Sequence, residues 1–178
     1  TVNSGGAYRQ SGVDVEGASE GGYDVGWIGA GEWLTYSVNV QAAGTYQLQA
    51  RVAAPSAGGT FHIEFGGVDL TGPLSVPATG GWQNWTTISK TVTLKAGAQQ
   101  ARVVFDAAGP SGIANLNWFA LSPASPTPYT GTPIALPGTI AVEKFDNGGE
   151  GLAYHDTTHG NAGGAVRATD VALEPSTL

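Results

Sequence analysis

Two of the five tryptophans lie beside glycines in segments that read as loops: Trp27 in VGWIGAG and Trp82 in GGWQNW. A large apolar ring has little structural reason to occupy a glycine-rich loop, so both rings are candidates for ligand contact. An indole stacks well on the apolar C–H face of a sugar ring, whose hydroxyl rim then needs directional hydrogen-bonding partners. The other three tryptophans fit packing roles. We predict that Trp33 and Trp118 lie in the core or on a sheet face, and that Trp85, at the end of GGWQNW, is a packing residue.

Acidic residues that stand singly along the chain raise the question whether the chain is an enzyme, a polysaccharide hydrolase or lyase. They are Asp24, Glu32, Glu64, Asp69 and Asp106. A glycosidase needs two carboxylates about 5–10 Å apart across the bond that it cleaves. These acids stand alone in turns and strands, with no signature pairing. We therefore predict that they are solvated surface acids and that the chain is not an enzyme.

The elements that position these residues read as short β-strands. Alternating segments separated by turn residues such as AAG, SAGG and KAGA predict strands at 33–40, 45–52, 60–65, 87–94, 101–107 and 114–121. No long window has the 3.6-residue period of an amphipathic helix. The pattern predicts an all-β fold, an antiparallel β-sandwich of the jelly-roll type.

The chain also repeats itself at its two ends, residues 3–20 and 161–178. Without gaps, seven of eighteen positions are identical: Asn3/Asn161, Gly5/Gly163, Gly6/Gly164, Ala7/Ala165, Arg9/Arg167, Val13/Val171 and Glu16/Glu174. A fixed period is typical of tandem units. We expect a frame cut from a tandem array, in which residues 139–161 look like the opening strand and loop of a fresh unit. Between the units, residues 123–138 hold five of the ten prolines and predict an extended linker.

The composition excludes several classes of partner. The net charge of −7 comes from fourteen acids against seven scattered bases, and nucleic-acid binding needs clustered Lys and Arg. The chain has no run of about 18 apolar residues that could span a membrane, and no cysteine for disulfides or thiol chemistry. Because only 12% of residues are charged, the polar surface must consist largely of Ser, Thr, Asn, Gln and Gly. Such a surface suits a neutral, hydroxyl-rich partner.

Four stretches resemble the family 6 carbohydrate-binding modules in order and spacing. They are VGWIGAGEWLTYSVNV (25–40), GTYQLQARVAAP (44–55), GGWQNWTTI (80–88) and NLNWFALS (115–122). Residues 139–147 resemble that family's opening segment, which in module order comes before residue 3. The resemblance implies a β-sandwich that binds polysaccharide without cleaving it and accompanies a secreted glycoside hydrolase.

The resemblance also implies a domain division. Residues 1–122 form a sandwich that lacks its opening strand, 123–138 form the linker, and 139–178 open a second repeat. Residues 139–161 are then expected to complete a sheet, either in their own molecule or as a swapped strand in a homo-oligomer. In either case an exposed sheet edge is covered.

The same resemblance implies a cleft in the loops at one end of the sandwich. There Trp27 and Trp82 clamp a sugar while Asn115 and Glu16 bind its hydroxyls. Glu16, not its twin Glu174, is expected to line the cleft, because residues 5–20 run directly into the body of the module.

A structural calcium ion is common in the family, held by two acids of the opening strand and one near the end of the last strand. Here Ala141 and Ser122 replace two of these acids, and only Glu143 remains. Calcium takes 6–8 oxygen ligands, so this loss argues against the site.

These observations favour a secreted, non-catalytic carbohydrate-binding module for a neutral β-linked polysaccharide. The first expected ligand is β-1,3-glucan of the laminarin type, followed by agarose or xylan. Two alternatives stay open: a small β-sandwich hydrolase or lyase, and a strand-swapped structural assembly unit.

Overall fold

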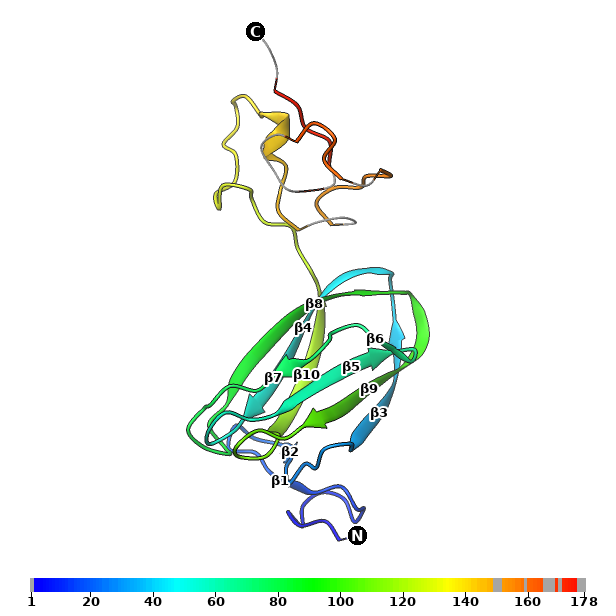
Figure 1. Ribbon diagram of the computed structural model, residues 1–178, viewed down its shortest axis with the longest axis vertical. Coiled ribbons are helices and arrows are strands. Elements are labelled where there is room, and N and C mark those ends of the chain that lie inside the picture. The colour runs from blue at the N-terminus through cyan, green and yellow to red at the C-terminus, as the bar shows by residue number, and fades with distance from the viewer. Residues whose placement is uncertain (1, 149–151, 159, 165–168, 170, 176–178) are drawn as a thin grey trace. The chain divides into compact units, whose positions relative to one another are not determined.

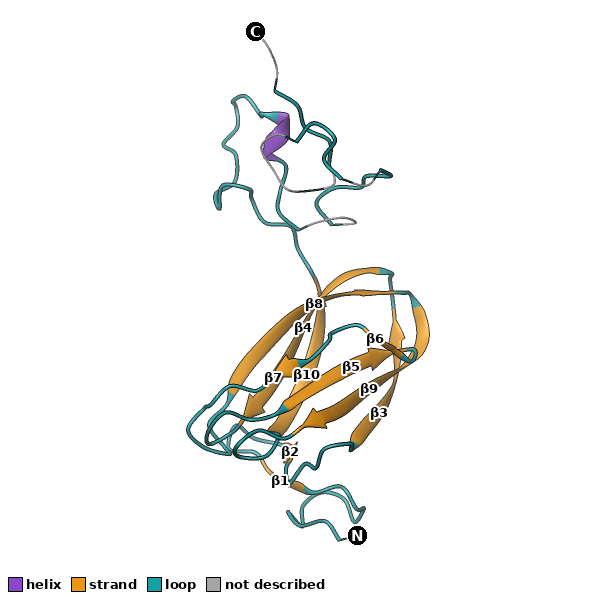
Figure 2. Ribbon diagram, in the orientation of Figure 1, coloured by secondary structure: helices purple, strands orange, loops and turns teal. Residues whose placement is uncertain are grey.

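The computed structural model describes residues 2–148, 152–158, 160–164, 169 and 171–175. The chain divides into two compact units, Thr1–Ser122 and Pro123–Leu178. Figure 2 shows the strands within the first unit, while the described part of the second unit consists of loops and one short helix. In the described part of the chain, no helix has the length and apolar character needed to cross a membrane.

The first unit is a sandwich of two antiparallel sheets (Figure 1). In chain order the strands are β1 (Val15–Gly17), β2 (Tyr23–Val25), β3 (Trp33–Val40), β4 (Gly44–Ala53), β5 (Thr60–Phe65), β6 (Val68–Asp69), β7 (Leu74–Ser75), β8 (Thr86–Leu94), β9 (Gly97–Ala107) and β10 (Asn115–Pro123). One sheet has the order β1-β2-β10-β4-β8, and the other has the order β3-β9-β5-β6, with β7 pairing β5. The predicted all-β sandwich is confirmed.

Alternation along the strands builds the core between the sheets. In β5, Phe61 and Ile63 are fully buried, and in the adjacent β9 Val103 pairs with Ile63 and is fully buried as well. In β4, Leu48 and Val52 are fully buried on the facing sheet. Because successive side chains of a strand point to opposite faces, every second residue reaches this core.

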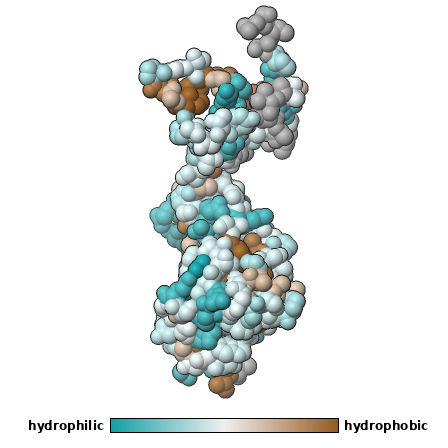
Figure 3. Space-filling model, turned by 90° about the vertical axis from the view of Figure 1, so that its left-hand side faces the viewer, coloured by the Kyte–Doolittle hydropathy of each residue, from teal (hydrophilic) through white to brown (hydrophobic). Residues whose placement is uncertain are grey.

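The surface of the sandwich carries little charge. Figure 3 shows mostly pale side chains of intermediate hydropathy on one face, with strongly hydrophilic and hydrophobic residues in small separate patches. This appearance agrees with the predicted surface of small polar residues.

Close backbone approach holds the loop that precedes β10. Gly59 N donates to Ile113 O at 2.8 Å, and a Cβ on Gly59 would lie 1.9 Å from the Ala107 carbonyl oxygen. Only glycine fits there, because no side chain tolerates such a contact. The contact fixes residues 107–114, which lead directly into Asn115.

A loop built around Asn3 precedes β1. The Asn3 side chain is 8% exposed; its Oδ1 accepts from Gly6 N (2.9 Å) and Val15 N (2.8 Å), and its Nδ2 donates to Ala7 O (2.9 Å) and Arg9 O (2.8 Å). All the hydrogen-bonding capacity of one amide therefore goes into closing this loop.

Described residues of the repeated sequence near the C-terminus make two of the same hydrogen bonds. Asn161 Oδ1 accepts from Gly164 N at 2.9 Å and from Leu173 N at 2.7 Å, at positions 158 residues after Gly6 and Val15. Gly6 and Gly164 share a φ of +66°, a left-handed conformation that favours glycine. The duplication in sequence is thus a duplication of local structure.

The opening strand predicted within residues 139–161 is absent from residues 139–148, 152–158, 160 and 161, which the structure describes. Val142–Lys144 form the 3₁₀ turn η1 instead, and Thr127 and Asn147 form an isolated bridge. The described residues of this segment contain no strand. Alternating apolar residues become a strand only where a partner supplies ladder hydrogen bonds, which explains the difference from the prediction.

The Asn3 loop gives a test with a built-in control. Replacing Asn3 by Ala removes four hydrogen bonds and leaves the buried Val15 N–H without its acceptor. We expect the free energy of unfolding of the sandwich to fall by about 3 kcal/mol in urea denaturation. Asn161→Ala is the matched control, since it removes the equivalent bonds from Gly164 N and Leu173 N in the second unit. Equal loss of sandwich stability in both variants would contradict this view of the loop.

Candidate functional site

A cavity of about 360 Å³ opens among the loops next to β1. It is lined by Glu16, Trp27, Ile28, Trp82, Gln83, Ser111, Gly112, Ile113, Ala114 and Asn115. All four residues predicted to form a binding site, Glu16, Trp27, Trp82 and Asn115, are therefore brought together, although they lie up to 99 positions apart.

Trp27 occupies a strained backbone conformation. Its φ of +50° lies in the left-handed region, which is an outlier for a bulky residue, and its side chain is 57% exposed. Neither burial nor backbone preference stabilises an indole there. Strain of this kind concentrates at functional sites, and here it presents an exposed ring to the cavity.

Trp82 lies in the loop that leads into β8, and its side chain is 41% exposed. The loop is anchored at Thr79, whose N donates to Ala54 O (2.8 Å) and whose Oγ1 accepts from Ala54 N (2.9 Å). The tip of the ring, Cη2, lies 3.6 Å from the position that a Cβ on Gly112 would occupy. A side chain at position 112 would therefore touch the ring.

Asn115, the first residue of β10, links Glu16 to the Trp82 loop through its side-chain amide. It is 4% exposed, and its Nδ2 donates to Glu16 Oε1 at 2.7 Å and to the Trp82 carbonyl oxygen at 3.1 Å. A Cβ on Gly26 would lie 2.9 Å from Asn115 Oδ1, so glycine is needed beside the amide. Both amide hydrogens of Asn115 are used within the protein, and only Oδ1 remains for a ligand hydroxyl.

Gln83 was missed by the sequence reasoning. Its Nε2 donates to Glu16 Oε1 and to Asp24 Oδ2, both at 3.0 Å, while its Oε1 accepts from Ser19 N at 2.7 Å. Ser19 Oγ in turn donates to Gln83 O at 2.9 Å and accepts from Trp85 Nε1 at 3.0 Å. The loop that carries Trp82 is thereby fastened to the β1–β2 turn. Trp85 contributes a hydrogen bond besides packing.

Asp24 was assigned wrongly from the sequence. It was predicted to be a solvated surface acid, but it is 1% exposed and lies directly opposite Glu16 in the β1–β2 pairing. Burial raises the pKa of Asp24 to about 6, an effect that the hydrogen bond from Gln83 opposes and the nearby Glu16 charge adds to. The pairing of VEG with YDV across a short turn is the sequence signal that could have revealed this carboxylate pair.

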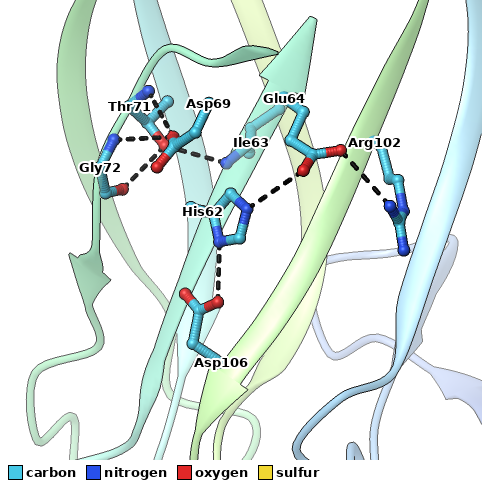
Figure 4. A network of polar contacts seen from close by, with 8 residues as sticks. All are labelled: His62, Ile63, Glu64, Asp69, Thr71, Gly72, Arg102 and Asp106. Atoms are coloured by element: carbon cyan, nitrogen blue, oxygen red, sulfur yellow. Dashed lines mark hydrogen bonds and ion pairs between the residues drawn. The ribbon is translucent and has the colours of Figure 1, made fainter. Parts of the chain in front are cut away.

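The other acids that suggested hydrolysis are absent from the cavity lining. Glu32 accepts from Gly29 N at 3.0 Å, and Glu64, Asp69 and Asp106 lie together in another polar network (Figure 4). His62 Nδ1 lies 2.7 Å from Asp106 Oδ1, and His62 Nε2 lies 3.6 Å from Glu64 Oε1. Glu64 also approaches Arg102 Nη1 at 3.6 Å, and Asp69 accepts two backbone N–H groups in the turn after β6. The acids of this network make structural contacts on one face of the sheet, as expected of surface residues.

Trp33 and Trp118 lie on sheet faces, not in the core. They are 54% and 40% exposed, and the Arg102 guanidinium carbon lies 4.7 Å from the centroid of the Trp33 ring. Both remain outside the lining of the cavity.

The doubtful calcium site expected at Glu143 stays a prediction. Glu143 lies in η1, and no group of three or more His, Cys, Asp or Glu in this part of the chain is arranged to hold a metal ion. A single carboxylate falls far short of the 6–8 oxygens that calcium takes.

Comparison with known proteins identifies the class. The model of a protein family described as "Carbohydrate binding module (family 6)" matches residues 7–123. A β-sandwich with an aromatic cleft, matched in this way, is a non-catalytic carbohydrate-binding module. The chain belongs to family 6 of these modules.

Solved structures agree with this assignment. The chain is similar to the C-terminal family 6 module of LamC, a marine laminarinase from Zobellia galactanivorans, with 41% identity and a TM-score of 0.55 over 63% of this chain and 89% of that one. It is also similar to a β-1,3-glucan-binding family 6 module from Bacillus halodurans, with 33% identity and a TM-score of 0.56 over 62% and 86% of the two chains.

Among curated proteins, the clotting factor G alpha subunit of Tachypleus tridentatus is 34% identical over 119 residues, which is 65% of this chain. The beta-agarase AgaA of Microbulbifer thermotolerans is 28% identical over 85 residues, or 47% of this chain. The match spans only 17% and 19% of the length of these two relatives.

The strain at Trp27 predicts that the glycine variant at this position is more stable than the alanine variant, the reverse of the usual order. Because glycine adopts a positive φ without penalty, Trp27→Gly should be more stable than Trp27→Ala by about 1 kcal/mol in urea denaturation. At Trp82, which has no positive φ, the order should reverse, with Trp82→Ala the more stable of the pair. The same order at both positions would exclude strain at Trp27.

Proposed function

We propose that the cavity binds a sugar unit of a neutral β-linked polysaccharide between Trp27 and Trp82, with β-1,3-glucan as the first ligand. The observation that carries the proposal is the pair of exposed indoles lining one cavity, one of them in a strained backbone conformation. Two rings can cover the apolar faces of a sugar and displace water from them. The volume of about 360 Å³ lies within the range of small-ligand sites.

The polar groups of the site favour hydroxyls over charges. Glu16 Oε1 accepts from Gln83 and Asn115, which leaves Oε2 to accept from a sugar hydroxyl. Asn115 Oδ1 offers a second acceptor. Because both groups accept hydrogen bonds and the net charge is −7, an anionic glycan would be repelled.

The arrangement of carboxylates supports binding without cleavage. Glycosidases place two carboxylates on opposite sides of the scissile bond. Here Glu16 and Asp24 bond to the same Gln83 amide, and Asp24 is absent from the cavity lining. Among the described residues that line the cavity, no second acid accompanies Glu16.

The choice of β-1,3-glucan draws support from the Bacillus halodurans module and from the laminarinase of which the LamC module is part. Agarose and xylan remain the next candidates, in keeping with the agarase relative and with a family 6 module from Clostridium cellulolyticum solved in complex with xylose. We further propose that the module belongs to a secreted polysaccharide-degrading enzyme and holds it on its substrate.

Replacing Trp82 by Ala tests the site. Isothermal titration with laminarin, agarose, xylan and cellulose should show the association constant for the preferred glycan falling by roughly 30-fold, which corresponds to about 2 kcal/mol of lost ring burial. Trp118→Ala is the control, because this ring is similarly exposed but lies outside the cavity. Unchanged affinity of Trp82→Ala for every glycan would refute the clamp, and release of reducing ends by the wild type would favour a hydrolase.

A strand-swapped assembly is the second candidate, favoured by an unpaired sheet edge. In the described residues β3 pairs only with β9, and apolar side chains near that edge are incompletely covered: Tyr36 is 41% exposed and packs edge-on against Phe119. Ile140 and Val142 are 54% and 85% exposed. We propose that residues 139–147 of a neighbouring copy pair with this edge and bury both sets of side chains.

Light scattering tests the swap. We expect the molar mass to double as concentration rises, and Val142→Asp to abolish the doubling because a charge cannot be buried at the new interface. Val68→Asp, at another exposed valine, should leave it unchanged. A monomer at every concentration would exclude the swapped assembly.

A further inference from the structure

Two carboxylates lie side by side beneath the cleft. Glu16 on β1 and Asp24 on β2 are direct partners in the antiparallel register, so their side chains share a face of the hairpin. Like charges placed opposite one another destabilise a strand pair. Asp24 is nevertheless 1% exposed, and its Oδ1 is buried without a hydrogen-bond partner.

One amide links the two acids. Gln83 Nε2 gives one hydrogen to Glu16 Oε1 and one to Asp24 Oδ2, each at 3.0 Å, and Gln83 Oε1 is occupied by Ser19 N. Every polar atom of the Gln83 side chain is therefore used. Removing the Asp24 acceptor would leave one Gln83 hydrogen unpaired and free the amide to turn away from Glu16.

We propose that Asp24 is a positioning residue of the sugar site, which acts through Gln83 to fix the Glu16 carboxylate and links sugar binding to the uptake of a proton. The proposal deepens the proposed function and rests on it, because Asp24 itself does not line the cavity. It assigns a role to a buried acid that the direct sugar contacts leave unexplained.

The direction of the linkage follows from desolvation. Burial already raises the pKa of Asp24 to about 6. A sugar seated over Glu16 removes the remaining water from the carboxylate pair and raises the pKa of Asp24 further. The complex then holds the proton more tightly than the free protein does, so affinity is highest at acidic pH and falls as pH rises through about 6.

The other groups around Asp24 leave this direction unchanged. Glu16 is the charged neighbour on β1, while Gln83 and Asn115 are neutral. Glu20, in the turn between β1 and β2, is neutralised by Arg51 of β4, whose Nε donates to Glu20 Oε2 at 3.0 Å.

The experiment is isothermal titration of the full chain at pH 5, 6, 7 and 8, with whichever of laminarin, agarose, xylan and cellulose binds in the panel. We expect the association constant of the wild type to fall about fivefold to tenfold from pH 5 to pH 8, because a tenfold change corresponds to one unit of pKa shift in the complex. Asp24→Asn keeps an acceptor for Gln83 without the charge, so it should bind equally at every pH. Asp24→Ala should bind about tenfold more weakly throughout.

Asp69→Asn is the matched control, since the Asp69 carboxylate accepts from N–H donors, as that of Asp24 does from Gln83, but lies on β6 (Figure 4) and outside the cavity lining. It should keep the wild-type pH profile. The proposal is overturned if Asp24→Asn keeps that profile too, or if Asp24→Ala binds like the wild type.

Failure of the proposed function is distinguishable from failure of this inference. If the wild type binds no glycan in the panel, the proposed function fails, and ¹³C NMR titration of the carboxyl groups decides the inference. The Glu16 signal should then report the titration of Asp24 in the wild type and lose that step in Asp24→Asn. A Glu16 signal that is the same in both proteins overturns the coupling.

Discussion

The cleft depends on one buried amide, that of Asn115. Its Nδ2 donates to Glu16 Oε1 at the edge of one sheet and to the carbonyl oxygen of Trp82 in a distant loop. Gln83, the residue after Trp82, makes the other direct side-chain link between this loop and Glu16. A short polar side chain at the start of β10 thus converts three separate pieces of chain into one site. An apolar residue of similar size would leave the Trp82 carbonyl oxygen without this donor.

Glycines allow the close approaches that surround the Asn115 amide. Gly26 allows Asn115 to approach within a distance that excludes a Cβ, and Gly59 brings the loop before β10 against the β4–β5 connection. The high glycine content that the sequence shows is therefore partly a property of the site.

The sequence predicted the long strands well and the short ones poorly. The ranges 33–40 and 60–65 match β3 and β5, because alternation over six to eight residues is a strong signal. The three-residue strands β1 and β2 give no such signal, since three residues contain hardly one period. The position of Asp24 depends on their pairing, and that is why its burial was not foreseen.

Trp27 and Trp82 stand out in the sequence as large rings beside glycines in loops. Glu16 and Asn115 could be named only through family resemblance, because no local pattern relates them across 99 positions. The sequence reasoning missed Gln83 for a different reason. A glutamine next to a candidate tryptophan looks like any other polar loop residue, and only the register of β1 against β2 reveals that it bridges two acids. The strand predicted within residues 139–161 shows the same limit, since a pattern cannot supply the neighbour that a strand requires.

The left-handed backbone of Trp27 has a consequence for the thermodynamics of recognition. An exposed side chain normally loses rotational freedom when it meets a ligand, and that entropy loss weakens every association. At Trp27 the backbone is ordered when the protein folds, so the entropy lost in ordering it is offset by the stability of the whole sandwich and not by the ligand. Each encounter with a ligand then begins from a backbone that is already in place. The strain weakens the fold slightly and, in exchange, preorganises the ring.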